Sequence, residues 1–293
     1  MNPIRSRLLL HDELRQASHR NQLFLLFQPC VELDSGRIIS TEALLRWRHP
    51  SRGTIPPDIF IPLAEAHGSI TDIGKWVLRN ACAQARQWHD AGLAWLRMAV
   101  NISAVQLEDP AFVDDVIGVL DRTGLDARFL EIEITETAFI RDVGTVASAL
   151  KALKRIGAAI SMDDFGVGYS RLGRLRRLPV DILKIDKSFV RGVAVDPRRR
   201  AIVHGMIRLA KMLGLTVVAE GVEMTSEYRF LRERQCDRAQ GFLMSRPVEP
   251  EKIPALVTAA RRPASAAATG RAPTDRNRPL SRISAAWHPR LVT

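Results

Sequence analysis

Cysteine is scarce in this sequence. Cys30, Cys82 and Cys236 are its only three cysteines, and they lie far apart with no CxxC pair. A disulfide-rich scaffold, a zinc ribbon and a c-type haem site are therefore disfavoured, and a reducing compartment is expected. A chain of 293 residues can bury roughly 75% of the surface that it exposes when unfolded, so it needs neither disulfides nor a structural metal to hold a core.

Long apolar runs are also missing. A membrane-spanning helix needs roughly 18 uninterrupted apolar residues, and the longest apolar stretches of this chain are broken by Arg, Asp or Glu. Near the N-terminus, leucines at 8–10 are followed directly by His11, Asp12 and Glu13, which is too short for the apolar region of a secretory signal. We therefore expect no transmembrane segment, no export and a cytoplasmic location.

The signatures of several enzyme classes are absent. The sequence contains no GxxxxGK[ST], no HExxH, no GxSxG and no GxGxxG that follows a strand-like run. P-loop nucleotide hydrolases, HExxH zinc proteases, nucleophile-elbow hydrolases and dinucleotide-binding enzymes are thus disfavoured. The seven histidines are scattered along the chain, and we expect ordinary core or surface roles for them.

Basic residues exceed acidic ones, and the excess is unevenly distributed. The net charge is +11, and seven arginines against one acidic residue within 261–293 contribute +6 of it. This segment also holds four prolines and shows no apolar periodicity, so it cannot offset the entropy lost on ordering. We expect residues 260–293 to form a disordered tail, and we expect no specific nucleic-acid binding. Electrostatic attraction of the tail to nucleic acid or to a membrane surface is the alternative.

The rest of the chain alternates between strand-like and helical segments. Residues 4–20 have an amphipathic helical pattern, and we interpret residues 1–20 as a connector-like helix. From residue 21 onward, short apolar or β-branched runs alternate with longer segments of helical period, which is typical of βα units with a mainly parallel sheet. Four helical segments end in a glycine that can adopt the left-handed conformation closing a helix: Gly92, Gly124, Gly157 and Gly214.

The number of strands indicates the fold. Strand-like runs lie at residues 23–31, 38–45, 97–102, 130–134, 158–162, 181–185, 215–219 and 238–243. Eight strands separated by helices over about 240 residues correspond to one (β/α)₈ barrel. The sequence therefore predicts an α/β fold with a TIM-like barrel over residues 21–259.

Polar side chains stand at the ends of the predicted strands. They are Gln28, Glu42, Asn101, Glu133, Asp163, Asp164, Lys184, Glu220 and Gln240. A single polar residue at a strand end is usually just solvated, but the carboxyl ends of the parallel strands of a barrel converge on one face. Their recurrence therefore predicts one polar mouth.

Five of these side chains are carboxylates, and Lys184 is the cation among them. Two like charges 4 Å apart repel by about 4 kcal/mol at an effective dielectric constant near 20, so several such pairs cannot all stay ionised unaided. Either some carboxylates are protonated or divalent cations lie among them. Oxygen ligands without Cys or His favour Mg²⁺ or Mn²⁺. Adjacent Asp163 and Asp164 suit two ions with one bridging carboxylate, an arrangement used for in-line displacement at phosphorus.

These residues resemble the EAL family of cyclic di-GMP phosphodiesterases, named for a triplet that stands here at Glu42, Ala43 and Leu44. The resemblance covers residues 21–259 and follows the family's order and spacing: TEALLRW at 41–47, NIS at 101–103, EITE at 133–136, DDFG at 163–166, LKID at 183–186, EGVE at 220–223 and QGF at 240–242. It implies a modified barrel whose first strand runs antiparallel. It also implies hydrolysis of cyclic di-GMP to linear pGpG with two Mg²⁺ or Mn²⁺ ions.

The resemblance further implies roles for individual side chains. The first metal ion would be held by Glu42, Asn101, Glu133 and Asp163. The second would be held by Asp163, Asp164 and Glu220. Lys184 would orient the attacking water and stabilise charge on the phosphoryl group. Glu42 is implied as a catalytic residue as well as a metal ligand. Glu220 is also a candidate general base, and its two roles stay open.

Substrate contacts are implied at Gln28, Leu44, Arg46, Asp164 and Gln240. Arg46 would grip a phosphate, for which a guanidinium fork is well shaped.

Glu136 and Glu223 resemble residues that support the loop at 163–172. Val167 and Arg171 differ from the residues that the family often has in this loop. We therefore expect this sequence to differ from the family in the ordering of the loop and in the control of turnover.

The partners implied by the resemblance are cyclic di-GMP as substrate, a second copy in a homodimer, and an upstream sensor, GGDEF domain or partner protein. The chain is then either a stand-alone enzyme or a piece of a longer one. The alternative function is a non-catalytic cyclic di-GMP receptor that signals through a protein partner. Degenerate receptors of the family usually lose ligands such as Glu42 or one Asp of the pair, and both are present in this sequence.

Overall fold

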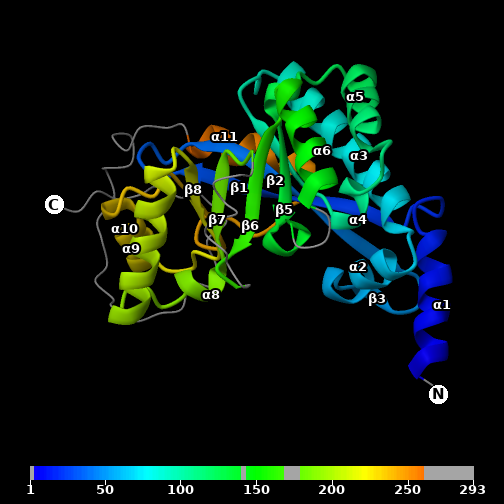
Figure 1. Cartoon of the computed structure of the whole chain (residues 1–293), viewed down its shortest axis with the longest axis horizontal. Coiled ribbons are helices and arrows are strands. Elements are labelled where there is room, and N and C mark those ends of the chain that lie inside the picture. Colours follow the sequence, from blue (N-terminus) through cyan, green and yellow to red (C-terminus); the bar gives the residue numbers. More distant parts are fainter. Residues whose placement is uncertain (1–2, 140–142, 168–178, 261–293) are drawn as a thin grey trace.

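Residues 3–139, 143–167 and 179–260 are described by a computed structural model of the chain, in which a barrel of strands is flanked by helices (Figure 1). The strands are β1 (Leu23–Glu32), β2 (Ile38–His49), β3 (Gly53–Ile55), β4 (Arg97–Asn101), β5 (Leu130–Thr135), β6 (Ala159–Phe165), β7 (Ile182–Ile185), β8 (Thr216–Ala219) and β9 (Arg238–Gln240). The helices are α1 (Pro3–Arg15), α2 (Pro57–Ala66), α3 (Ile70–Asp90), α4 (Ala104–Leu107), α5 (Phe112–Thr123), α6 (Val143–Arg155), α8 (Lys187–Val190), α9 (Pro197–Met212), α10 (Thr225–Glu233) and α11 (Ile253–Ala260). Short 3₁₀ turns lie at η1 (Ala127–Phe129), η2 (Glu136–Phe139) and η3 (Pro250–Lys252).

Strand pairing closes the barrel. The order is β1-β9-β8-β7-β6-β5-β4-β2-β3, and β1 also pairs with β2. The strands from β2 through β4 to β9 run parallel, whereas β1 is antiparallel to both of its neighbours, β2 and β9. The predicted TIM-like barrel and its reversed first strand are thus confirmed.

Two elements differ from the sequence-based expectation. β3 was not predicted, because its three residues are too few to show an apolar run; it pairs antiparallel with the end of β2, which extends to His49. The N-terminal helix ends at Arg15 rather than at residue 20, because the chain turns there toward β1. In that turn the Ala17 N–H donates to the Leu14 carbonyl and the Gln22 N–H to the Ala17 carbonyl.

Helix faces with a period near four residues pack on the barrel. In α3 the buried side chains include Ile73, Val77, Ala81 and Trp88, which lie on one stripe of the helix. The Trp88 ring meets Phe27 of β1 edge to face, with ring centroids 4.9 Å apart. This apolar contact fixes α3 against the outside of the barrel.

The four glycines predicted to close helices all have positive φ, between 68° at Gly124 and 106° at Gly157. This conformation is costly for residues with a Cβ atom, so the sequence signal for these helix ends is confirmed.

None of the helices within the described ranges is long and apolar enough to cross a lipid bilayer. The predicted tail at 260–293 lies outside those ranges except for Ala260.

Candidate active site

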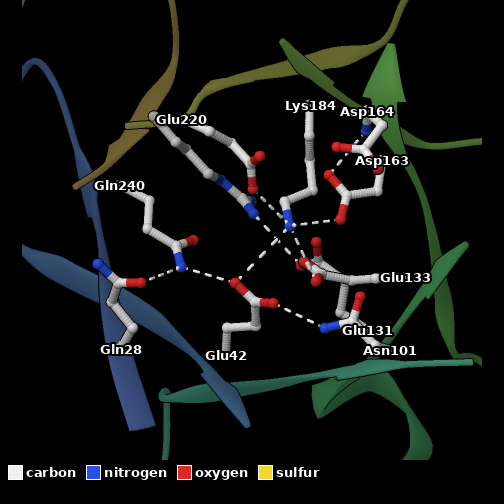
Figure 2. Close-up of polar contacts among 11 residues, drawn as sticks. Gln28, Glu42, Asn101, Glu131, Glu133, Asp163, Asp164, Lys184, Glu220 and Gln240 are labelled. Carbon is white, nitrogen blue, oxygen red and sulfur yellow. Dashed lines mark hydrogen bonds and ion pairs between the residues drawn. The ribbon is translucent and has the colours of Figure 1, made fainter. Parts of the chain in front are cut away.

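The nine polar residues predicted at strand ends lie together at one end of the barrel (Figure 2). β2, β4 and β5 supply Glu42, Asn101 and Glu133, and the end of β6 supplies Asp163 and Asp164. Lys184 lies on β7, Glu220 directly follows β8, and Gln28 and Gln240 lie on the neighbouring strands β1 and β9. We call these nine side chains the polar ring. They converge because side chains alternate across each strand and the inward-facing ones meet in the barrel.

Lys184 lies at the centre of the polar ring and is only 1% exposed. Its Nζ is 2.7 Å from Glu220 Oε1 and 2.9 Å from Glu133 Oε2. The same nitrogen is 3.4 Å from Asp163 Oδ2 and 3.8 Å from Glu42 Oε2. One ammonium therefore faces four carboxylates, more than it can neutralise if all four are ionised.

Three amide side chains fix the orientation of Glu42. Asn101 Nδ2 donates to Glu42 Oε1 at 2.7 Å, and Gln240 Nε2 donates to Glu42 Oε2 at 2.6 Å. Gln240 also donates to Gln28 Oε1 at 3.2 Å, and Gln28 Nε2 in turn donates to the Ser245 carbonyl. The two oxygens of Glu42 are thus held by amides from β4 and β9, and Gln28 of β1 acts through Gln240.

Asp163, Asp164 and Glu220 each offer one carboxylate oxygen, and these oxygens lie within 4.8 Å of one another. Asp164 has a φ of +54°, a left-handed conformation that is uncommon for a residue other than glycine. Its N–H donates to Asp163 Oδ1 at 2.9 Å. The turn lets two consecutive side chains face the same site, which an ordinary strand, with alternating directions, does not allow. An all-oxygen set of this kind suits a hard divalent cation.

Crowding of carboxylates shifts their protonation. Burial, followed by the charge of Glu42, raises the pKa of Glu133 well above its usual value. Burial also acts to raise the pKa of Glu42, but Lys184 and the amides of Gln240 and Asn101 outweigh it and lower the pKa overall. The pKa values of these two neighbouring glutamates therefore shift in opposite directions, because only Glu42 has three partners that stabilise its anion.

Burial and neighbouring charges also shift the pKa values of Lys184 and Glu220. Burial favours a neutral Lys184, yet the surrounding carboxylates, Asp163 and Glu133 foremost, raise the pKa of its ammonium well above the usual value. Burial raises the pKa of Glu220 to about 8 despite the nearby Lys184. Lys184 thus remains a cation, and Glu220 is poised to hold or release a proton near neutral pH.

A groove of about 1190 Å³ opens from the polar ring. Asn101, Glu133, Asp163 and Asp164 line its inner end, and α2 and α3 line its far wall. Leu44 and Arg46 on β2 also line this groove. Arg46 is half-buried, and its Nη1 donates to the Leu45 carbonyl at 2.8 Å. The structure therefore places the predicted substrate contacts of β2 beside the ring.

The two predicted loop-supporting residues lie outside the ring. Glu223 forms an ion pair with Arg191, which joins the segment after β8 to the segment after α8. Glu136 opens the 3₁₀ turn η2 directly after β5. Half of the loop that they were predicted to support, residues 168–172 with Arg171, lies outside the described residues, while Val167 is 63% exposed.

Sequence reasoning missed two charged residues of the barrel interior, Glu131 on β5 and Arg238 on β9. They ion-pair at 3.6 Å between Arg238 Nη1 and Glu131 Oε2. Burial raises the pKa of Glu131 although Arg238 acts against it. Glu131 does not stand at a strand end, but the period of two along LEIEIT puts it on the same face as Glu133 and could have indicated it.

Comparison with known proteins adds independent information. A model of the EAL domain family matches residues 11–247. The cyclic di-GMP phosphodiesterase NbdA of Pseudomonas aeruginosa is 46% identical over 241 residues, which make up 82% of this chain and 31% of NbdA. The bifunctional diguanylate cyclase/cyclic di-GMP phosphodiesterase MucR of the same organism is 46% identical over 249 residues, 85% of this chain and 36% of MucR. The chain thus spans about a third of the length of these curated relatives.

Solved structures show the same fold. The PaMucR phosphodiesterase in complex with c-di-GMP superposes with a TM-score of 0.80 at 46% identity, covering 84% of this chain and 99% of that one. The EAL enzyme Bd1971, bound to cAMP and cyclic di-GMP, gives a TM-score of 0.83 at 31% identity, covering 88% of this chain and 70% of that one. Since the family model matches most of the sequence and the barrel agrees with these structures, the chain belongs to the EAL domain family.

Proposed function

We propose that this protein hydrolyses cyclic di-GMP to linear pGpG with the help of two divalent cations. The observation that carries the proposal is the polar ring, in which five carboxylates meet one lysine at the mouth of an EAL barrel. Relatives at 46% identity that are named cyclic di-GMP phosphodiesterases support the same substrate.

The ring fits two Mg²⁺ or Mn²⁺ ions in the donors that it offers. Glu42, Asn101, Glu133 and Asp163 would hold the first. Asp163, Asp164 and Glu220 would hold the second, and their mutual approach within 4.8 Å supports this set. Bound divalent cations supply positive charge that neutralises the phosphodiester oxygens and favours attack at phosphorus.

Residues of the chain would carry out the other parts of the reaction. Lys184 places an ammonium beside Glu133 and Glu220, where it orients the attacking water and stabilises charge on the phosphoryl oxygens. A bond forms between the water oxygen and phosphorus while the bond to the 3′ oxygen breaks. The proton lost by the water passes to a ring carboxylate, for which Glu220 is the candidate where it does not hold the second cation. The released 3′ oxygen takes a proton from bulk water, to which the carboxylate returns the proton that it accepted, so that pGpG carries the 5′ phosphate.

The groove beside the ring accounts for binding of a large anionic substrate. Its volume of about 1190 Å³ is at the upper end of ligand pockets, which range over roughly 300 to 1,000 Å³. Arg46 on β2 lines this groove and would pair with a phosphate, while Gln28 and Gln240 border the ring. Leu44 adds an apolar surface beside them.

Incubation of the purified chain with cyclic di-GMP and Mg²⁺ or Mn²⁺, followed by chromatographic separation of the products, tests the proposal. We expect pGpG from the wild type and at least about a hundredfold lower kcat from Glu42→Gln, because the lost interactions act mainly in the transition state. Glu249→Gln is the matched control, since this glutamate is exposed and its ion-pair partner is Lys252, which is not a member of the ring. Absence of pGpG overturns the proposal, and tight binding without turnover would identify a receptor instead.

The expected homodimer, upstream domain or partner, and cytoplasmic location form part of the same proposal. Analytical ultracentrifugation at the concentrations of the assay tests the dimer, and the dependence of specific activity on protein concentration shows whether turnover requires it.

A further inference from the structure

A second layer of side chains lies in the barrel below the polar ring. Glu131 precedes Glu133 by two residues on β5, and Arg238 precedes Gln240 by two residues on β9. Positions two apart on a strand point to the same face and lie about 6.6 Å apart along it. The lower layer therefore contains its own acid and its own base directly beneath the ring.

The ion pair in this layer is buried and loosely fixed. Glu131 is 3% exposed, and its Oε2 lies 3.6 Å from Arg238 Nη1. Neither of these two atoms has a hydrogen-bond partner among the described residues. Apart from members of the polar ring, the side chains that line this part of the interior with the pair are uncharged, namely Cys30, Ser40, Ala99 and Val218. Glu131 is thus the carboxylate that pairs with the guanidinium in the lower layer.

Arg238 is close enough to the ring to interfere with it. The guanidinium shares one interior cavity of about 10 Å³ with Glu131, Glu133 and Glu42, a space of about one water molecule. Glu133 and Glu42 share the ammonium of Lys184 with two further carboxylates. A guanidinium that left Glu131 would be attracted to Glu133 and would occupy a carboxylate proposed to bind a cation.

We propose that Glu131 is a positioning residue for cation binding: it holds the Arg238 guanidinium in the lower layer and so keeps it off Glu133 and Glu42. The inference rests on the proposed function, because it takes the polar ring to be the cation site. It assigns a role to a buried acid that contributes no ligand itself.

Isothermal titration of the full chain with Mn²⁺ tests the inference in four forms: wild type, Glu131→Gln, Arg238→Met and the double variant. Glu131→Gln should weaken Mn²⁺ binding by at least about tenfold, because the freed guanidinium competes with the cation at Glu133. Arg238→Met alone should bind Mn²⁺ at least as tightly as the wild type. The double variant should recover affinity to within about threefold of the wild type, since the competitor is gone.

Recovery in the double variant separates this role from a merely structural one, because a general loss of packing would grow with the second substitution. Equal binding by the wild type and a folded Glu131→Gln variant would overturn the inference alone, as would a double variant as weak as Glu131→Gln. If circular dichroism shows that Glu131→Gln does not fold, the titration of Arg238→Met tests the inference instead. A tenfold loss of Mn²⁺ affinity in Arg238→Met contradicts the inference, and unchanged or tighter binding supports it. A wild type that binds no Mn²⁺ removes the proposed cation site itself, and the inference with it.

Discussion

At the scale of single residues, the unusual feature is a buried lysine that serves more carboxylates than it can neutralise. Lys184 Nζ lies within 4 Å of Glu42, Glu133, Asp163 and Glu220. Removing one charged partner from a buried ionic cluster lowers the free energy of unfolding far more than removing an exposed charge, because the remaining buried charges are left without compensation. Lys184 therefore contributes to the stability of the metal-free protein as well as to the chemistry of its site.

Replacement of Lys184 by Met should lower the free energy of unfolding of the metal-free protein by about 3 to 5 kcal/mol. Urea denaturation in the presence of a chelator measures this value. Lys252→Met serves as the control, since that side chain is 63% exposed and its ion pair with Glu249 contributes little. Equal stability of the two variants would show that the cluster does not depend on its lysine.

At the scale of helices and strands, the site depends on close backbone contacts near β9. A Cβ atom at Gly241 would lie 2.2 Å from the Val222 carbonyl oxygen and 2.3 Å from the Val222 nitrogen. These are backbone atoms between β8 and α10, so they cannot turn aside as a flexible side chain would. Glycine at this position allows Gln240 to reach Glu42.

Gly241→Ala should therefore cost about 1 to 3 kcal/mol of stability and weaken the hydrogen bond from Gln240 to Glu42. Thermal unfolding and the turnover assay report the two effects. The matched control is Gly205→Ala in α9, where a Cβ atom would meet nothing within 4 Å and where alanine should stabilise the helix by about 1 kcal/mol. A neutral result at Gly241 would mean that the two segments move apart freely.

The N-terminal helix α1 packs beside α2 through a pair of histidines. The rings of His11 and His67 lie 4.2 Å apart, and His11 is 8% exposed. Burial, followed by the charge of His67, lowers the pKa of His11, with a smaller opposing effect of Asp12. Protonation of the buried ring is thus unfavourable in the folded state.

Relative to His11→Gln, the stability of the wild type should consequently fall as the pH is lowered from 7.5 to 5.5. The pKa of His11 is lower in the folded state than the usual value near 6.5 in the unfolded chain, so at this residue the unfolded state binds more protons over this range. Glu133 and Glu220, whose pKa values are raised, contribute in the opposite direction in both proteins, so urea unfolding of wild type and His11→Gln at both pH values measures the contribution of His11 as a difference. The exposed His204 provides the control, and an equal pH dependence in both variants would contradict the assignment.

Much of this architecture could be predicted from the sequence, and the exceptions have physical causes. Apolar runs and glycine-terminated helices indicated the barrel, because burial and helix closure leave strong local signals. The reversed direction of β1 came only from the family resemblance, since an apolar run such as residues 23–31 carries no record of its direction. The left-handed conformation of Asp164 was not foreseen, because a positive φ at an aspartate leaves no signal in the sequence. The alternation along β5 does place Glu131 on the inner face, but its pairing with Arg238 depends on a contact between strands distant in sequence.

At the scale of the whole molecule, the polar ring draws on strands all around the barrel. Among the described residues its members run from Gln28 on β1 to Gln240 on β9, and the groove is lined by residues between 43 and 164. The positively charged segment at 261–293 follows all of them in the sequence.

Deletion of residues 261–293 should leave kcat within about twofold of the full chain, because all members of the polar ring precede this segment and its composition predicts a disordered tail. The turnover assay on both proteins at equal concentration checks this. A large loss of activity would assign the segment a role in the reaction. Loss of salt-sensitive binding to nucleic acid or anionic vesicles in the shortened chain would instead assign it the electrostatic role.

The closure of the barrel by β1 and β9 has a consequence for biosynthesis. The first strand of the chain pairs with the last one, and Gln28 accepts a hydrogen bond from Gln240. Translation produces the chain from its N-terminus onward. The polar ring therefore cannot close until β9, some 200 residues after β1, has been synthesised. The site therefore forms only once translation has passed the last strand, and a prematurely terminated chain would lack a complete ring.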